Sequence, residues 1–366
     1  MLNKAFQFVI ERVKRLKTLL KSRTIYFLGL SGLAFVTLSG LGLTLSTIKN
    51  PSEYLNYCSR STASYFSFIS PPYQNYLCTI YTGLQSLPES PGAQLLVAQL
   101  VRFGTIFNAI LIYESHRQTG WWARRGLTVF LFVAQVLSGA VAAPLYFAVV
   151  YYHNDAEDVK SVKAEEGWSM LFSLLLGYLL PAYLGSRDSW SNGGITAFLC
   201  FPIYLATLNT VLPPILKTVM RGTTARVPIA LTTILCMVVS VQGHVRLLWG
   251  DNPLKYIYSP LLGVPGPVRD IHLLTLHDYV FATLALASYT VLRIRELAPT
   301  YDRRMGVSTL VVLLCTQGDP AALVAWLWGS AELGRAGDDS DDGSSRQGQT
   351  NSKQERVRLL NKEAGR

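Results

Sequence analysis

Long apolar runs separated by short polar stretches dominate the chain. Each run is long enough to cross a bilayer core of ~30 Å at ~1.5 Å per helical residue. Because lipid offers no hydrogen-bond partners to the backbone, helices are the expected structure. The pattern predicts an all-α, polytopic transmembrane helical bundle with about eight spans, or seven if either the fourth or the fifth does not cross. The predicted spans are 25–47, 94–113, 128–150, 168–186, 194–213, 227–247, 275–294 and 308–329.

The polar stretches divide the chain into three regions. Residues 1–24 carry seven basic residues and one acid, with apolar residues on one face, which predicts an amphipathic helix on an anionic membrane surface. Residues 25–330 are the predicted transmembrane domain. Residues 331–366 are rich in Gly, Ser, Gln and charge, and predict a disordered polar tail. Cys58 and Cys78 lie in the loop between the first two spans, where a disulfide is an open alternative.

Composition agrees with a membrane protein. Half of the residues are hydrophobic (50%) and only 15% are charged, against about a quarter in a soluble protein. The formal net charge is +10, and the basic start of the chain contributes strongly to it. That segment lacks base-reading or stacking chemistry, so we expect membrane lipids and no nucleic acid as its partner.

Charged residues that flank the spans bear on orientation. The basic start and the 114–127 loop favour a cytosolic N-terminus and C-terminus, and the acidic 152–167 loop suits the lumen. We expect the membrane to be that of the endoplasmic reticulum. Under eight spans, however, the basic residues near 217–226 and 293–304 would be lumenal, which conflicts with the same rule.

Polar side chains inside the apolar runs are candidate functional residues, because an unpaired charge in lipid is costly. Arg102 lies ~12 Å into its span by helix rise. Asp319 lies at similar depth and precedes Pro320, which predicts a helix break. We therefore expect Arg102 and Asp319 to pair beside a substrate cavity, with a purely structural ion pair as the alternative. The candidate substrate-binding residues are Arg102, Asn108, Tyr146, His244, His277 and Asp319.

Glu114 and Asp278 are the candidate catalytic acids. Under eight spans they share the cytosolic rim with His244, beneath an apolar cavity. A low-dielectric site favours the protonated carboxyl group, which is the form that a general acid needs. The alternative for Glu114 is an ordinary carboxylate at the membrane interface.

Aromatic residues are frequent in and near the spans. Ring faces can stabilise a cation, although packing and interface belts account for most such rings. We expect two or three of them to line a pocket. The aromatic candidates are Phe107, Tyr113, Tyr146, Tyr178, Tyr183, Phe201, Tyr204 and Tyr279.

Motifs for several other chemistries are absent from the sequence. Paired Asp-rich loops, HxxxH or HxxHH histidine spacings and a phosphate-binding Gly-rich loop are all missing. Their absence disfavours a magnesium-dependent prenyltransferase, a di-iron enzyme and an ATP-driven pump. The acidic segment at 338–342 lies in the polar tail. We expect no metal and no cofactor.

Three segments resemble a known family. VRFGTIFNAILIYESHR, QVLSGAVAAPLYFAVVYYH and LHDY are similar to the fungal integral-membrane terpene cyclases of meroterpenoid pathways, especially the macrophorin- and ascofuranone-type branch. The resemblance covers roughly residues 95–330, in short diffuse motifs. It implies a metal-independent cyclase of isomerase or lyase type, which protonates an epoxide or a terminal alkene of a prenylated compound.

The same resemblance implies an early Glu and a late Asp as intramembrane acids, to which Glu114 and Asp278 correspond by order. It also implies a lipophilic prenylated substrate, supplied by pathway enzymes such as a prenyltransferase and an epoxidase. Two alternatives remain open: a transporter or binding protein for a hydrophobic metabolite, and an accessory membrane subunit in which neither acid matters.

Overall fold

The computed structural model of this 366-residue chain describes most of the predicted transmembrane domain. Its secondary structure is entirely helical in the described residues, which confirms the all-α prediction. Residues 1–24, Cys58 and Cys78 lie outside them. The described residues are 25–36, 84–85, 91–117, 121–153, 162–187, 192–220, 223–249, 267–297, 309, 312, 316 and 319–334.

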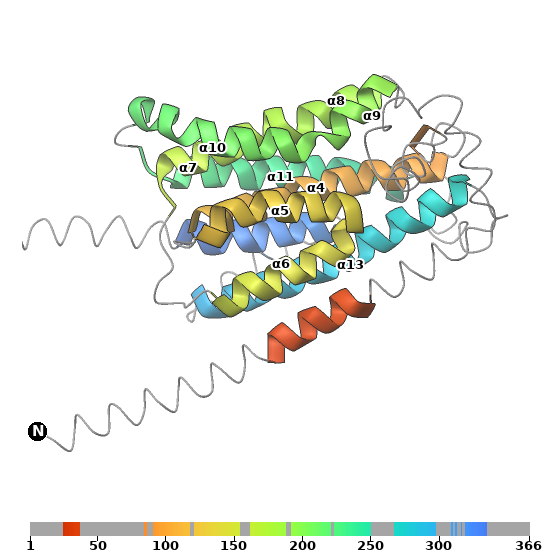
Figure 1. Cartoon of the computed structure of the whole chain (residues 1–366), viewed down its shortest axis with the longest axis horizontal. Coiled ribbons are helices and arrows are strands. Elements are labelled where there is room, and N and C mark those ends of the chain that lie inside the picture. Colours follow the sequence, from red (N-terminus) through yellow and green to blue (C-terminus); the bar gives the residue numbers. More distant parts are fainter. Residues whose placement is uncertain are drawn as a thin grey trace, which may run out of the picture.

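The helices lie roughly along one axis and form a bundle (Figure 1). A short helix, Ile25–Val36, precedes them, and a helix over 320–334 follows them. The labelled elements are α4 (Pro91–Arg117), α5 (Trp121–Leu137), α6 (Gly139–His153), α7 (Ala164–Phe172), η2 (Ser173–Leu179), α8 (Leu180–Arg187), α9 (Asn192–Leu199), α10 (Phe201–Val219), α11 (Arg226–Leu248) and α13 (Pro267–Leu297).

The prediction of one continuous span over 128–150 is wrong. Ser138 has φ 86° and separates α5 from α6, which returns beside it (Figure 1). Its carbonyl oxygen accepts hydrogen bonds from the N–H groups of Val141 and Ala142, so it ends one helix and starts the next. The Ser138-Gly139 dipeptide, a common turn signal, therefore overrides the apolar run around it.

Two further predicted spans are irregular. α7, η2 and α8 form one apolar helix whose middle, Ser173–Leu179, is a π-helix. α9 and α10 are bent by 49° at Cys200, so they form either a broken span or a re-entrant loop. The helix break predicted at Asp319 is confirmed: residue 319 is not helical, and Pro320 begins the last described helix.

The predicted number of eight spans is not confirmed. By length and composition, three described helices can cross a membrane, namely Gln94–Arg117, Ala164–Ser186 and Arg226–Val245. The bent pair α9–α10 brings the number to four. Ile25–Val36, Gly126–Gln135 and Gly139–Tyr152 are apolar but shorter. Predicted span 275–294 lies within α13, and the last helix continues to residue 334, past the predicted domain end at 330.

α4 occupies the centre of the bundle and packs against α5, α7, α11 and α13. Its residues from Thr105 to Arg117 are all buried. Apolar side chains of α4, α6 and α13 supply much of the core, including a stacked pair of rings, Phe147 and Tyr289, with centroids 4.3 Å apart. α4, which carries the predicted intramembrane residue Arg102, is thus the central helix of the bundle.

One end of the bundle, which we call the arginine end, is defined by Arg117, Arg293 and Glu332. The carboxylate of Glu332 contacts Arg117, and the carboxylate of Glu114 contacts Arg117 and Arg293. These contacts bring the C-terminal ends of α4, α13 and helix 320–334 together. The opposite end, where Ser138 joins α5 to α6, is called the Ser138 end.

The turn at Ser138 changes the expected arrangement of the loops. Because α6 runs back from Ser138, its last turn lies at the arginine end, where Tyr151 contacts Tyr26. The start of α7 lies beside the start of α11, where a methyl group added at Gly167 would come within 2.8 Å of Pro228. Figure 1 places these helix ends at the arginine end as well. The acidic 152–167 segment was predicted on the opposite side from the 114–127 loop, but the helices that flank both segments end together.

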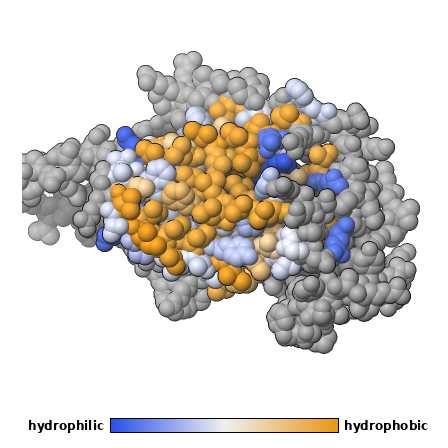
Figure 2. Space-filling view, turned by 90° about the horizontal axis from the view of Figure 1, so that it is seen from above, coloured by the Kyte–Doolittle hydropathy of each residue, from blue (hydrophilic) through white to orange (hydrophobic). Residues whose placement is uncertain are grey.

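A broad apolar surface covers α8, α9 and α10, with hydrophilic residues toward both ends (Figure 2). Large exposed side chains on these helices include Leu180, Leu184, Ile203 and Ile215. A contiguous apolar surface of this kind is compatible with membrane association.

Candidate functional site

A cavity of ≈ 190 Å³ lies between α4, the Ser138 turn, η2, the α9–α10 bend and α13. Its wall is mostly apolar, with aliphatic side chains such as Val97, Leu100 and Ala282. Aromatic lining residues are Phe103, Phe107, Tyr178, Phe198 and Phe201, and polar ones are Asn108, Gln135, Ser138, Thr275 and Asp278. An apolar pocket with a few convergent polar groups is the usual form of a small-molecule site.

Asp278 is the one carboxyl group among the described lining residues of this cavity. Its Oδ1 accepts a hydrogen bond from Ser138 Oγ and another from the backbone N–H of Ala140, at 3.1 Å. Asp278 thus joins α13 to the first turn of α6, where unpaired backbone N–H groups and the helix dipole favour an acceptor. The predicted acid is therefore anchored and also borders the cavity.

Aromatic rings form one side of the cavity. Phe103 and Phe107 stack along α4 with centroids 6.4 Å apart, and Tyr178 meets Phe201 edge to face at 4.9 Å. Of the eight aromatic candidates, Phe107, Tyr178 and Phe201 line the cavity, which confirms the expected two or three. Their faces can stabilise positive charge within this mostly apolar cavity.

Tyr178 is fixed by two contacts with α4. Its hydroxyl donates a hydrogen bond to the carbonyl oxygen of Val101 at 2.7 Å. Gly104 leaves room for it, since a Cβ atom built at Gly104 would lie 1.9 Å from the Tyr178 oxygen. Tyr178 belongs to the π-helix η2, and π-helical segments frequently occur at functional sites. The π-helical segment therefore supplies part of the cavity wall.

Asn108 supplies the second polar group that the sequence predicted. Its Nδ2 donates to the carbonyl oxygen of Gly104 at 2.8 Å, while its Oδ1 is buried and has no hydrogen-bond partner. A buried acceptor without a partner carries a desolvation cost. A substrate hydroxyl group could remove that cost by donating to Oδ1.

Glu114 lies in a buried ion cluster and not in the cavity lining. Its Oε1 is 3.2 Å from Arg117 Nη1, and its Oε2 is 3.3 Å from Arg293 Nη2. Arg117 Nη1 also lies 2.7 Å from Glu332 Oε1, and Tyr113 donates to Glu332 Oε2 at 2.8 Å. An ionised carboxylate held by two guanidinium groups has no proton to give.

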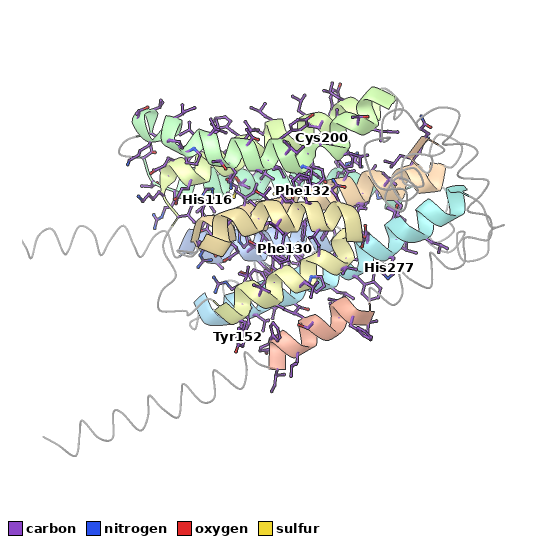
Figure 3. The ribbon with its side chains drawn as sticks, viewed as in Figure 1. His116, Phe130, Phe132, Tyr152, Cys200 and His277 are labelled. Atoms are coloured by element: carbon purple, nitrogen blue, oxygen red, sulfur yellow. The ribbon has the colours of Figure 1, made fainter. Side chains whose placement is uncertain are left out.

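The prediction that Glu114 and Asp278 share one rim is wrong. Arg293, the partner of Glu114, lies fifteen positions after Asp278 in α13, which is ~22 Å along a helix. Figure 3 shows the same separation, because His116 is near one end of the bundle and His277 is toward the other. The physical reason is the turn at Ser138, which adds a chain reversal between the two acids.

The expected ion pair between Arg102 and Asp319 is not among the described contacts. Arg102 lies against α11, where a Cβ atom built at Gly243 would come within 2.6 Å of Arg102 Cδ. Asp319 is fully buried, and its Oδ1 accepts a hydrogen bond from the N–H of Ala321 at 3.0 Å. It thus caps helix 320–334. Neither residue is among the described residues that line the cavity.

Three other predicted substrate-binding residues also lie outside the described cavity lining. Tyr146 is buried in the core, where its hydroxyl donates to the carbonyl oxygen of Leu111 at 3.3 Å. His277 is half-buried, with its ring 4.7 Å from that of Phe281. His244 is partly buried near the end of α11.

Sequence reasoning missed Ser138 and Gln135, which both line the cavity. The Ser-Gly dipeptide at 138–139 was an available signal for a turn. Gln135 is an ordinary polar residue near the end of an apolar run and gave no such signal. Within the part of the chain that the structure describes, no group of three His, Cys, Asp or Glu residues is arranged to hold a metal ion.

Comparison with known proteins adds evidence independent of the geometry. No family model matches the chain, and no solved structure matches it. The chain is 27% identical over 178 residues to Terpene cyclase resF of Aspergillus sclerotiorum. This similarity supports membership of the fungal terpene cyclase family.

The resemblance to a fungal terpene cyclase that the sequence motifs indicate is thus confirmed as a similarity. The matched region covers 46% of this chain and 46% of resF, so the chain spans about half the length of that relative. The macrophorin- and ascofuranone-type branch remains a prediction.

Proposed function

We propose that this protein is a membrane-bound terpene cyclase that starts ring closure by protonating a lipophilic, prenylated substrate. Asp278 is the proton donor, and the cavity around it holds the prenyl chain. The observation that carries the proposal is the position of this carboxyl group, which is the one acid among the described residues lining an aromatic, apolar cavity. Similarity to a terpene cyclase supports the same class of reaction.

The reaction needs no oxidant or reductant. Asp278 transfers its proton to the oxygen of a terminal epoxide, and the carbon–oxygen bond breaks as the electron pair of a nearby alkene forms a carbon–carbon bond. A terminal alkene carbon can accept the proton in the same way. The final cation loses a proton to a base, or a substrate hydroxyl group traps it and gives up its own proton to a base. One proton is thus lost for the one that Asp278 donated, so the product is an isomer of the substrate.

The rest of the cavity supports this chemistry. Apolar walls exclude water, which would otherwise trap the cation early. Phe107, Tyr178 and Phe201 present rings that can stabilise a migrating positive charge. Asn108 Oδ1 is our candidate acceptor for a hydroxyl group on the head of the substrate, because it is buried without another partner. A prenylated phenol made by a prenyltransferase, and then oxidised by an epoxidase, fits these features.

Orientation follows from the shared position of the basic loops. We infer that the arginine end faces the cytosol, because the 114–127, 217–226 and 293–304 stretches adjoin helix ends gathered there, and all three are basic. Both ends of the bundle domain, near residues 25 and 334, would then be cytosolic, in the endoplasmic reticulum membrane. Protection of a C-terminal tag from protease in sealed microsomes would contradict this orientation.

Conversion of a substrate by microsomes tests the enzyme proposal. Membranes from cells that express the chain are supplied with a panel of prenylated phenols, with and without a terminal epoxide. We expect a product of unchanged mass and altered chromatographic retention. The methyl ether of the same phenol should bind more weakly, because it cannot donate to Asn108.

Asp278→Asn provides the decisive comparison, since the amide keeps the shape of the side chain and cannot donate a carboxylic proton. Turnover should fall by about 10²–10⁴-fold, the usual contribution of general acid catalysis. Glu165→Gln, a partly buried change in the first turn of α7, is the matched control and should remain active. Saturable binding of the panel without any conversion would contradict the cyclase proposal and favour a transporter or binding protein.

A further inference from the structure

Ser138 occupies an unusual backbone conformation beside the proposed acid. Its φ is 86°, and no other described non-glycine residue has a positive φ. Such a conformation is unfavourable for most residues, and it persists where the surroundings require it. Glycine would adopt it without that cost. Since serine and not glycine occupies this position, we expect its hydroxyl group to have a functional role.

That hydroxyl group is directed to one oxygen of Asp278. Ser138 Oγ and the N–H of Ala140 both donate to Oδ1, the second over 3.1 Å. Ser138, Gly139 and Asp278 all line the cavity. The turn that reverses the chain between α5 and α6 thus supplies two donors to the same oxygen of the acid.

We propose that Ser138 is a positioning residue that keeps Oδ1 as the carbonyl oxygen of Asp278, so that the transferable proton lies on Oδ2. This inference rests on the proposed function of Asp278 as the proton donor. A proton on Oδ1 would compete with the two donors that already approach that oxygen. The neutral acid therefore has one favoured arrangement, with its O–H on the oxygen that Ser138 and Ala140 do not occupy.

The same two donors act again after proton transfer. The carboxylate that remains would be poorly stabilised in an apolar cavity. Ser138 and Ala140 are already in place to donate to it, and they need no rearrangement during the reaction. Ala140 also lies in the first turn of α6, where the helix dipole favours negative charge. Ser138 should thus assist the step in which the proton leaves and contribute little to substrate binding.

Two substitutions separate the hydroxyl group from the backbone conformation. Ser138→Gly removes the donor and suits the positive φ, whereas Ser138→Ala removes the same donor and retains the unfavourable φ. If the hydroxyl group acts as proposed, both variants should lose kcat by about 10- to 100-fold, the effect of one hydrogen bond to a charged group. KM should change much less in both.

The two variants should differ in stability. Ser138→Gly should unfold at the same temperature as the parent chain or higher, and Ser138→Ala at a lower temperature than Ser138→Gly. Turnover is measured per folded molecule in detergent, with the folded fraction obtained from size-exclusion chromatography. Parent-like kcat in Ser138→Gly would overturn the inference, because the turn alone would then explain the serine.

The outcomes distinguish this inference from the proposed function. If the parent chain converts substrate and Asp278→Asn does not, the proposed function stands, and Ser138→Gly then decides the inference alone. If Asp278→Asn keeps full turnover, the proposed function fails and the inference fails with it. A loss in Ser138→Gly that lies in KM and leaves kcat unchanged would also overturn the inference, because it would indicate a role in binding.

Discussion

Carboxyl groups lie near both ends of the bundle, and they have opposite surroundings. At the arginine end, Glu114 and Glu332 contact the guanidinium groups of Arg117 and Arg293. At the Ser138 end, Asp278 receives hydrogen bonds from a hydroxyl group and a backbone N–H, with no described cation among the residues that line its cavity. One environment balances full charges, and the other supports a carboxyl group that can gain and lose a proton.

The difference shows why burial alone does not identify a catalytic acid. Glu114 is fully buried, as a catalytic acid in a dry site can be, but guanidinium groups occupy both of its oxygens. Such a cluster ties helices together, and removing one member leaves a charge without a partner. Asp278 has neutral partners and borders open space. We therefore assign stability to the arginine end and chemistry to the Ser138 end.

The largest expected effect on stability comes from removing the shared cation of the ion cluster. Arg117→Met keeps an unbranched apolar stem and leaves Glu332 without its guanidinium partner. The free energy of unfolding should fall by about 3–5 kcal/mol, as for other broken buried ion pairs. Thermal unfolding in detergent micelles measures the loss, and turnover per folded molecule should stay close to that of the parent chain.

Two controls make this prediction specific. Lys217→Met removes an exposed cation from α10 and should have little effect on unfolding. Adding Glu332→Gln to Arg117→Met should recover part of the lost stability, because no carboxylate then remains unpaired at that position. Equal unfolding temperatures for Arg117→Met and Lys217→Met would refute the structural role of the cluster.

A smaller effect is expected when the cavity wall is disturbed. Gly104→Ala would place Cβ 1.9 Å from the Tyr178 oxygen, so the ring must shift away from Val101 and Gly104. We expect kcat/KM to fall by about 10-fold, since small displacements near reacting atoms have effects of this order or larger. The ratio of cyclised products should also change, because the ring helps to shape the folded prenyl chain.

Gly126→Ala is the matched control for this change. It makes the same substitution in helix α5, where a Cβ atom would meet nothing within 4 Å. Both stability and product ratio should stay near those of the parent, or stability should rise slightly. Identical product ratios from Gly104→Ala and Gly126→Ala would show that Tyr178 does not shape the substrate.

Local patterns in the sequence predicted the features that depend on neighbouring residues. The apolar runs gave the all-helical class, and Asp319 followed by Pro320 gave a helix break that the structure contains. Asp278 was identified because it is an acid at the start of an apolar helix, and it borders the cavity. In each case the sequence pattern and the structural feature that it predicts lie within a few residues of each other.

Features that need residues far apart in the chain could not be predicted. The ion cluster joins Glu114 and Arg117 of α4 to Arg293 and Glu332, which lie about two hundred residues later. No pattern of neighbouring residues predicts that these four side chains come together. The Ser138 turn was detectable in principle, and missing it placed Glu114 and Asp278 on the same rim. One unrecognised reversal thus changed the expected position of every later helix end.

The most direct test of the two assigned roles compares Asp278→Asn with Glu114→Gln in one preparation. The measurement is turnover per folded molecule, together with the unfolding temperature of each variant. Asp278→Asn should unfold near the parent temperature and lose about 10²–10⁴-fold in turnover. Glu114→Gln should unfold at a clearly lower temperature, while its folded molecules turn over substrate at nearly the parent rate. If folded Glu114→Gln is inactive and Asp278→Asn is active, the assignment of chemistry to the Ser138 end is wrong.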